Sequence, residues 1–442
     1  MNGGMPEERR LNLLVVICHD LGKHLGCYGR RDVRSPHIDE FASEGLRFDR
    51  CFCAAPQCSP ARAALWTGRY PHANGVVGLA HGKFANDLHA GERHFAEILA
   101  DAGYETALFG TQHESPNWRR CGYRHRYPQA PALKLAEDFG TFVSEREGEA
   151  EPWFAQIGFF EPHRPFPSEG VERKPPEAVD PLPHLPDIPE VREDLADMEA
   201  SVATADRAFG RILKALRESS FAENTLVLFT SDHGIPFPRA KMALYDPGIE
   251  VPLVLQGPGF PRGAICGEMV SHLDVLPTLL EVLGVPLPDN LHGRSFHPLL
   301  QGSDWKGNPA IFSEKTYHTY YDPMRSIRTE RWKLIVNFEN APWQQTQPDI
   351  FRNSKSYYEV AKALDRPHSM MYHDAYELYD LEADPLEEKN LAEEVEFQST
   401  RDLLIVQLRE WMEATGDPLL EGPIPQGTYL RRMEAFKAVK RE

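Results

Sequence analysis

Residues 58–76 read CSPARAALWTGRYPHANGV. Pro60 suits the first turn of a helix and Gly68 suits its end, so the stretch predicts a short helix that begins at Cys58. The first turn of a helix carries unpaired backbone N–H groups and the positive end of the helix dipole, which together stabilise an anion. Cys58 is therefore expected beside an anion-binding position, whereas a buried thiol with no chemical role is the plain alternative.

Apolar runs lie on both sides of this stretch, end abruptly in polar residues and alternate with amphipathic segments. This alternation is typical of a parallel sheet covered by helices. We predict an α/β fold in which helices sandwich a large, mostly parallel sheet. The apolar runs are 11–18, 106–109, 153–160, 225–229 and 251–255, and the helical segments are 39–44, 92–102, 192–218 and 275–283.

The residues just after the apolar runs are the first candidates for a functional site. In an open parallel sheet, ligands bind beyond the carboxyl ends of the strands. The residues found there have side chains that bind metals, protons or anions. They are His19 and Asp20, Thr111 to His113, Glu161 to His163, and Asp232 with His233.

The pattern changes from about Tyr321. Short strand-like runs at 324–329 and 332–338 precede a helical segment at 400–414, which predicts a smaller antiparallel α+β domain. We therefore expect a catalytic domain over 1–320 and a C-terminal subdomain over 321–442. Nine prolines lie between Pro162 and Pro189, which excludes regular helix and central strand and predicts a surface excursion near the site.

The composition excludes several classes of protein. A formal net charge of -18 argues against binding to nucleic acid or to an anionic membrane surface. The seven cysteines are an odd number in a long chain, so we expect no disulfide framework, and Cys51 with Cys53 lacks the second pair of a metal site. The apolar run after the N-terminal charges is too short to span a membrane and has no cleavage site, so a cytoplasmic protein is expected.

Residues 58–62 match C-x-P-x-R, and 58–76 as a whole resembles the corresponding stretch of the formylglycine-dependent sulfatases of the alkaline-phosphatase superfamily. This resemblance implies that a formylglycine-generating enzyme oxidises Cys58 to formylglycine, whose aldehyde hydrates to a geminal diol. One hydroxyl would attack sulfur and the other would later expel sulfate, which is a form of covalent catalysis. Arg62 is implied to hold the diol and balance its charge.

The resemblance also implies a divalent metal ion, because attack on an anionic sulfate ester brings like charges together. The implied ligands are Asp20, Asp232 and His233 beside Cys58. The family usually has two adjacent aspartates where this chain has His19 followed by Asp20. His19 is therefore either a nitrogen ligand or a residue that caps a strand end, and Ca2+ is the first expectation with Mn2+ as the alternative.

Three further positions match residues that handle the substrate in this family. His113 is one of them, and His163 is implied to contact the sulfate or to protonate the leaving oxygen, a task suited to histidine. Lys241 is implied to meet the sulfate, with Arg239 as the second candidate because register in a loop is uncertain. Thr111 stands where the family often has a lysine.

Three segments are similar to the N-sulfoglucosamine sulfohydrolase branch of the family, namely 230–254, 320–338 and 376–392. The similarity implies a small N-sulfated or O-sulfated saccharide as substrate, such as a heparan fragment, and is compatible with a homodimer. Because loops around the site select substrates in such folds, we expect 162–189 and 76–89 to matter most.

Two other functions stay open at this point. A phosphonate monoester or phosphodiester hydrolase with the same modified cysteine is favoured by Thr111, by His233 and by a softer metal. A catalytically silent protein that binds sulfated glycans is suggested by the departures at His19 and Thr111. The presence of the nucleophile, cation and ligand positions together argues against such a silent protein; they are Cys58, Pro60, Arg62, Asp232 and His163.

Overall fold

The structure is a computed structural model of the chain and describes residues 10–81, 84, 86–303, 305–340, 353–363 and 372–438. Within these residues, eight strands form the main sheet. Their spatial order is β4 (His125–Tyr127), β3 (Glu105–Gly110), β5 (Trp153–Gly158), β1 (Asn12–Cys18), β6 (Thr225–Ser231), β7 (Glu250–Gln256), β2 (Leu46–Phe52) and β8 (Ala264–Ser271).

The predicted fold class is confirmed, but one strand runs in the opposite direction to that expected. β7, which contains the run 251–255, is antiparallel to both of its neighbours, β6 and β2. All other pairings in the main sheet are parallel. The connection from β6 to β7 contains only the short helix α7 (Asp246–Ile249), whereas a parallel return needs a long crossover that is usually a helix.

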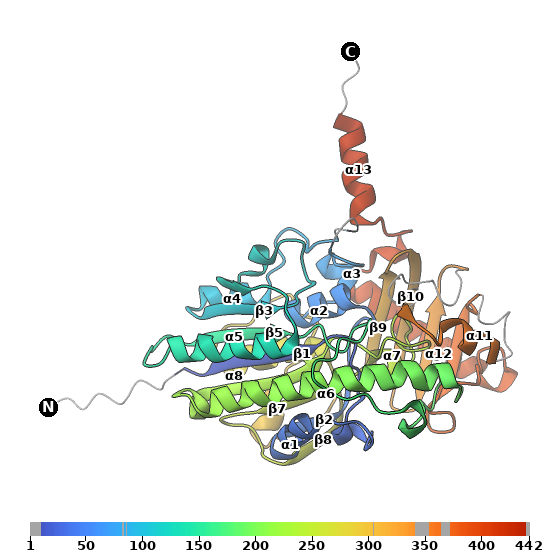
Figure 1. The fold of residues 1–442 in the computed structure, drawn as a ribbon. Coiled ribbons are helices and arrows are strands. Elements are labelled where there is room, and N and C mark those ends of the chain that lie inside the picture. The colour runs from blue at the N-terminus through green and yellow to red at the C-terminus, as the bar shows by residue number, and fades with distance from the viewer. Residues whose placement is uncertain are drawn as a thin grey trace.

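Helices cover both faces of the main sheet (Figure 1). Side chains alternate along the central strand β1, so Leu14 and Val16 face one layer and Leu13 and Val15 face the other. Both faces are buried, which explains the unbroken apolar run of β1. One layer contains α1 (Pro36–Glu44), α5 (Ala132–Glu145) and α6 (Pro189–Arg217), and the other contains α2 (Cys58–Thr67), α4 (Phe95–Asp101) and α8 (Val275–Val282).

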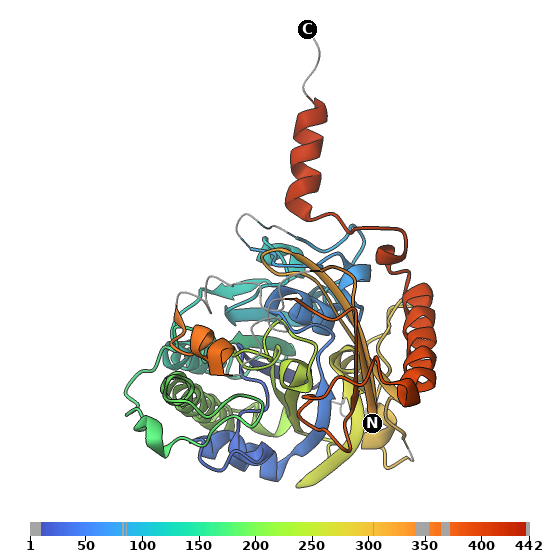
Figure 2. The same ribbon diagram turned by 90° about the vertical axis from the view of Figure 1, so that its right-hand side faces the viewer.

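A second, antiparallel sheet of four described strands lies beside the main sheet (Figure 2). Its order is β12 (Tyr376–Asp380), β11 (Trp332–Asn337), β10 (Tyr321–Thr329) and β9 (Ala310–Tyr317). α12 (Gln398–Thr415) packs on it through Leu404, Leu408 and Trp411. β9 precedes residue 321, so the second sheet starts earlier in the chain than the expected domain boundary between residues 320 and 321. The division into two domains stays a prediction.

The remaining helices are short or peripheral. α13 (Gly427–Ala438) projects away from the body of the molecule (Figures 1 and 2). The others are α3 (Pro71–Asn74), α9 (His297–Leu300) and α11 (Tyr357–Ala363), with single turns of 3-10 helix at η1 (Gly26–Tyr28), η2 (Trp118–Cys121), η3 (Pro176–Ala178), η4 (Ala222–Asn224), η5 (His272–Asp274), η6 (Val395–Phe397) and η7 (Pro418–Leu420).

The cysteines, the proline-rich stretch and the apolar character of the helices are the last features of the fold. The seven cysteines are all free, as expected from their odd number. The proline-rich stretch contains only the single turn η3 before α6 begins at Pro189. Among the described helices, none combines the length and the apolar character that a membrane crossing requires.

Candidate active site

The register of the main sheet explains why distant residues meet. Cys18, the last residue of β1, pairs with Ser231, the last residue of β6, so the residues that follow the two strands emerge side by side. Ile17 of β1 also pairs with Gly158 at the end of β5, which in turn pairs with Gly110 of β3. Four strands therefore deliver their following loops to one edge of the sheet, as predicted for parallel strands.

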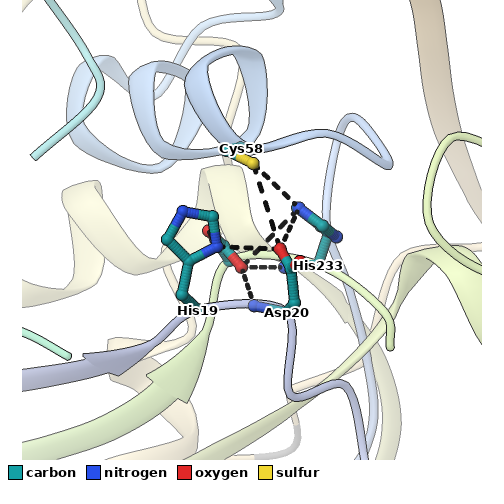
Figure 3. A group of neighbouring side chains, drawn as sticks. His19, Asp20, Cys58 and His233 are labelled. Carbon is teal, nitrogen blue, oxygen red and sulfur yellow. Dashed lines mark hydrogen bonds and ion pairs between the residues drawn. The ribbon is translucent and has the colours of Figure 1, made fainter. Parts of the chain in front are cut away.

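Cys58 lies at the first position of α2 and faces this edge from above (Figure 3). The helix ends at Thr67, where Gly68 adopts a left-handed conformation with φ 65°, so the predicted helix is confirmed. The Cys58 thiol is buried and its Sγ lies 3.4 Å from Nε2 of His233 and 3.9 Å from Oδ1 of Asp20. The nucleophile position and the strand ends thus form one site.

Five side chains offer donor atoms that all lie within 4.8 Å of one another, and all five are buried. They are the five predicted around the metal: His19, Asp20, Cys58, Asp232 and His233. Nδ1 of His19 lies 2.8 Å from Oδ1 of Asp20 and 3.4 Å from Oδ2 of Asp232. Nε2 of His233 lies 3.1 Å from Oδ1 of Asp20. This donor set is compatible with one divalent cation held between the ends of β1 and β6.

Backbone conformation helps to aim Asp20 into the cluster. Its φ is 58°, a left-handed value that aspartate tolerates better than most residues. The backbone N–H of Asp20 donates to Oδ1 of Asp232 at 2.9 Å, which locks the two strand ends together. An Asp at this position is therefore suited to both the backbone and the chemistry.

Arg62 lies one turn along α2 from Cys58 and is completely buried. Its Nε donates to Oδ2 of Asp232 at 2.9 Å. Its Nη1 and Nη2 have no hydrogen-bond partner among the described residues. Two buried donors without partners are costly unless a ligand or a modified side chain accepts from them, so Arg62 has two donors available for an oxyanion beside Cys58.

Lys241, and not Arg239, reaches the cluster. Nζ of Lys241 donates to Oδ2 of Asp20 at 2.7 Å and lies 3.3 Å from Nε2 of His163. The guanidinium of Arg239 instead donates to the backbone carbonyl oxygens of Leu386 and Glu387 at 2.9 and 2.6 Å. Arg239 therefore holds its loop against the segment after β12, and Lys241 is the residue of this loop that places a positive charge in the cluster.

The predicted histidines also gather here. The ring of His19 makes edge contacts with His113 and His163, with centroids 5.1 and 4.5 Å apart. The ring of His81, from the loop 76–89, lies 4.8 Å from that of His113. Sequence reasoning did not single out His81, because an exposed histidine outside any motif gives no signal.

Glu114 is a second residue that the sequence reasoning missed. It is buried, and its carboxylate accepts the backbone N–H of His113 at 2.8 Å. Burial raises the pKa of Glu114, and the nearby Arg62 opposes that rise. In the sequence, the only feature that pointed to Glu114 as a site residue was its position directly after His113. Thr111, directly after β3, is buried with an Oγ1 that has no partner among the described residues.

Opposite charges shift the protonation equilibria of the cluster. Burial lowers the pKa of His19, but Cys58, Asp232 and Asp20 outweigh burial and raise it to about 9. Burial raises the pKa of the Cys58 thiol, but Lys241 and His19 outweigh burial and lower it to about 7. Cationic surroundings that stabilise a thiolate would equally stabilise another anion at this place.

The sulfatase family profile matches residues 11–285, and the profile of the N-sulphoglucosamine sulphohydrolase C-terminal domain matches residues 237–368. The chain belongs to the sulfatase family. The sequence resemblance is thereby confirmed, and with it the activity of a sulfate ester or sulfamate hydrolase. Membership also implies a metal ion and a formylglycine nucleophile, for which the cluster at Cys58 has suitable donors.

Two curated relatives illustrate the similarity of this sulfatase to others. It is 29% identical to the human N-sulphoglucosamine sulphohydrolase, over 95% of this chain and 93% of the relative. It is 27% identical to an ulvan-active sulfatase of Formosa agariphila, over 93% of this chain and 82% of the relative. Both similarities cover nearly the whole chain.

Solved structures agree on the fold. A 2-O GAG sulfatase superposes with a TM-score of 0.73 at 23% identity, covering 93% of this chain and 94% of the other. The phosphonate monoester hydrolase of Agrobacterium radiobacter superposes with a TM-score of 0.70 at 22% identity, covering 92% and 96%. At these identities the superpositions establish the fold of the sulfatase and not its substrate.

Proposed function

We propose that this sulfatase removes sulfate from a small sulfated saccharide, with the Cys58 position as nucleophile. The observation that carries the proposal is the convergence of Cys58, Arg62 and Lys241 with two buried carboxylates at the carboxyl edge of the main sheet. Two cations flank the nucleophile, and an anion such as a sulfate group is the natural occupant of a position between them.

Formylglycine at position 58 would supply a geminal diol. One hydroxyl would lose its proton and bond to sulfur as the bond from sulfur to the leaving atom breaks. The second hydroxyl would then lose its proton, so that the carbon–oxygen bond to the sulfate breaks, sulfate leaves and the aldehyde is restored. Arg62 would hold that diol through Nη1 and Nη2. Lys241 would meet the sulfate from the opposite side, and His163, whose Nε2 lies 3.3 Å from Nζ of Lys241, would protonate the leaving atom. We assign His113 to the sulfate as well.

We propose that a divalent cation is held by Asp20, Asp232, His19 and His233. It would offset the negative charge that accumulates as the nucleophile approaches the sulfate. Ca2+ is the ion expected from the family resemblance, and Mn2+ is the alternative that the two imidazoles raise. Maturation would require a formylglycine-generating enzyme in the host, and the homodimer stays a prediction.

An N-sulfated or O-sulfated sugar is the substrate class that the relatives support. The human relative is named for N-sulphoglucosamine and the Formosa relative for ulvan. The match of the N-sulphoglucosamine sulphohydrolase C-terminal profile to residues 237–368 favours glucosamine N-sulfate as the first compound to test.

The second candidate is hydrolysis of a phosphonate monoester or phosphodiester. One observation favours it: Thr111 stands where the family often has a lysine, a cation that would bind sulfate. The fold, which a phosphonate monoester hydrolase shares, is compatible with either reaction. The two reactions use the same nucleophile, so they differ only in the atom that it attacks, which is sulfur in one and phosphorus in the other.

The experiment compares the kcat/KM values for an aryl sulfate and the matching aryl phosphonate, followed by inorganic sulfate release from glucosamine N-sulfate and glucosamine 6-O-sulfate. The protein is co-expressed with a formylglycine-generating enzyme. We expect the sulfate to be the better aryl substrate. A phosphonate preference would replace the first candidate with the second, and no turnover of any of the four compounds by fully converted protein would favour a silent binding protein.

A further inference from the structure

The donor set of the proposed metal site is poor in oxygen. Of the five side chains with donors in mutual reach, only Asp20 and Asp232 supply oxygen. His19 and His233 supply imidazole nitrogens, and Cys58 supplies a sulfur that formylglycine would replace with oxygen. Ca2+ takes about six to eight oxygen ligands, whereas imidazole nitrogen is a ligand of first-row transition metals. The side chains therefore fit Ca2+ less well than the family expectation requires.

The carboxylate oxygens are also partly committed to other groups. Oδ2 of Asp20 accepts from Nζ of Lys241 at 2.7 Å, and Oδ2 of Asp232 accepts from Nε of Arg62 at 2.9 Å. Oδ1 of Asp232 accepts the backbone N–H groups of Asp20 and His233, each at 2.9 Å. Bidentate binding of both carboxylates to one cation would compete with all four donors.

The ring of His233 has the orientation of a metal ligand. Its Nδ1 lies 3.0 Å from the carbonyl oxygen of Gly234, an acceptor, so Nδ1 carries the proton. Nε2 is the ring nitrogen that faces the cluster, 3.1 Å from Oδ1 of Asp20 and 3.4 Å from Sγ of Cys58, so a metal ion would bind there in place of a proton (Figure 3). A backbone carbonyl that fixes the second ring nitrogen in this way is usual for metal-bound histidine.

His19 is held in the cluster by its surroundings. It is completely buried, and its ring is packed edge-on against His113, His163 and Phe160, with centroids 5.1, 4.5 and 5.9 Å apart. Its Nδ1 lies 2.8 Å from Oδ1 of Asp20 (Figure 3) and 3.4 Å from Oδ2 of Asp232. A rotation that removed this nitrogen from the site would have to displace three packed rings.

We infer that this site selects a first-row transition-metal ion over Ca2+, with nitrogen ligation by His19 and His233. The inference rests on the proposal that the cluster is the metal site of the enzyme. It replaces Ca2+, the first expectation, with a metal of the Mn2+ type. Mn2+ is the reference ion of the class, because it accepts both carboxylate oxygen and imidazole nitrogen and can be observed by electron paramagnetic resonance.

The test measures metal binding without turnover. Cys58→Ala protein is used, so that a free thiolate contributes nothing to the affinity for soft ions. Metal-free protein is titrated calorimetrically with Mn2+ and, separately, with Ca2+. We expect binding of Mn2+ to be at least about tenfold tighter, and the pulsed resonance spectrum of the bound Mn2+ to contain couplings to 14N nuclei.

The matched variants are His19→Asp with His233→Asn, which convert both nitrogen donors to oxygen donors. We expect this pair to lower Mn2+ affinity about 10- to 100-fold, to abolish the 14N couplings and to reverse the preference in favour of Ca2+. His125→Asp makes the same chemical change at an exposed position and should alter neither affinity.

Ca2+ binding as tight as Mn2+ binding, or bound Mn2+ without 14N couplings, would overturn the inference. Sulfate release is measured separately on the unsubstituted protein. Mn2+ selectivity without sulfate release would contradict the proposed function and leave the metal inference standing. Sulfate release with Ca2+ selectivity would contradict the metal inference and leave the proposed function standing.

Discussion

Cys58 is the residue on which the reaction depends, and its oxidation is directly measurable. The conversion of its thiol to the aldehyde lowers the mass of the peptide by about 18 units and creates the activated nucleophile. We expect peptide mass spectrometry to detect this loss after co-expression with a formylglycine-generating enzyme. Cys53, which is also buried, is the internal control and should keep its mass.

Arg62 offers the second test at this scale. Arg62→Lys keeps the charge opposite Asp232 but removes the planar pair Nη1 and Nη2. We expect the protein to fold and kcat/KM to fall about 100-fold, because preorganised donors at the reacting group are lost. Arg409→Lys on the exposed face of α12 is the control. An unchanged kcat/KM in Arg62→Lys would show that the two free nitrogens have no catalytic task.

At the scale of elements, the loop between β6 and β7 determines where Lys241 lies. Two residues of this loop, Arg239 and Met242, adopt left-handed backbone conformations with φ 59° and 72°, which cost free energy unless the surroundings impose them. The hydrogen bonds from Arg239 to the carbonyl oxygens of Leu386 and Glu387 are part of those surroundings.

We therefore expect Arg239→Ala to lower kcat/KM roughly 10- to 100-fold by displacing Lys241. Added guanidinium ion should restore part of the activity of Arg239→Ala and none of the activity of Lys241→Ala. The two substitutions combined should cost little more than Lys241→Ala alone, since residues that act as a unit are not additive. Additive losses would mean that Arg239 acts independently of Lys241.

The contact between α6 and α1 contains a buried carboxyl group. Oδ1 of Asp206 accepts the backbone N–H of Ile38 at 2.8 Å, and burial raises the pKa of Asp206 from 3.8 to about 7. Between these two values the folded protein retains a proton that the unfolded chain releases. Stability therefore falls as the pH rises through this window.

We expect Asp206→Asn to remove this component of the pH dependence. The free energy of unfolding of the variant, relative to that of the unsubstituted protein, should rise by about 1–3 kcal/mol between about pH 4 and pH 8. Urea unfolding at a series of pH values measures it. Parallel pH profiles for the two proteins would contradict the raised pKa.

At the scale of the whole molecule, a buried ion pair joins the second sheet to the segment after α12. Arg325 of β10 binds Asp417 through two hydrogen bonds of 2.6 and 3.0 Å, and both side chains are fully buried. Nδ1 of His72, in α3, lies 3.9 Å from the same carboxylate. Through His72, α3 and the C-terminal region thus share one network of buried charges.

Asp417→Ala leaves the charge of Arg325 buried without its partner, so we expect a loss of about 3–5 kcal/mol in the free energy of unfolding. Chemical denaturation measures this loss, and Glu421→Ala, at an exposed position nearby, is the control. A loss below about 1 kcal/mol would mean that water or another residue compensates the arginine.

The sequence predicted the central strands and the residues that follow them, because apolar runs buried on both faces and ended by His19 or Asp232 are visible without a structure. It also predicted α2 from Pro60 and Gly68. It did not predict the direction of β7, because an apolar run has no polarity and the direction depends on the connection. β2, β4, β8 and α5 were also not predicted.

The same limits apply to the candidate site. Motif positions such as Cys58 and Lys241 could be found from the sequence, and the structure brings them together. The loop register between Arg239 and Lys241 could not be decided, because it depends on hydrogen bonds to residues 386 and 387, far along the chain. Glu114 and His81 gain their positions only through tertiary packing.

The most direct test of the account is inorganic sulfate release from glucosamine N-sulfate by the formylglycine-bearing protein and by Cys58→Ala, at equal concentration and with matched far-ultraviolet spectra. The account predicts that the formylglycine-bearing protein releases one sulfate for each molecule of glucosamine N-sulfate consumed. Cys58→Ala should show only the uncatalysed background. Equal release by both proteins would contradict it, since position 58 would then not be the nucleophile.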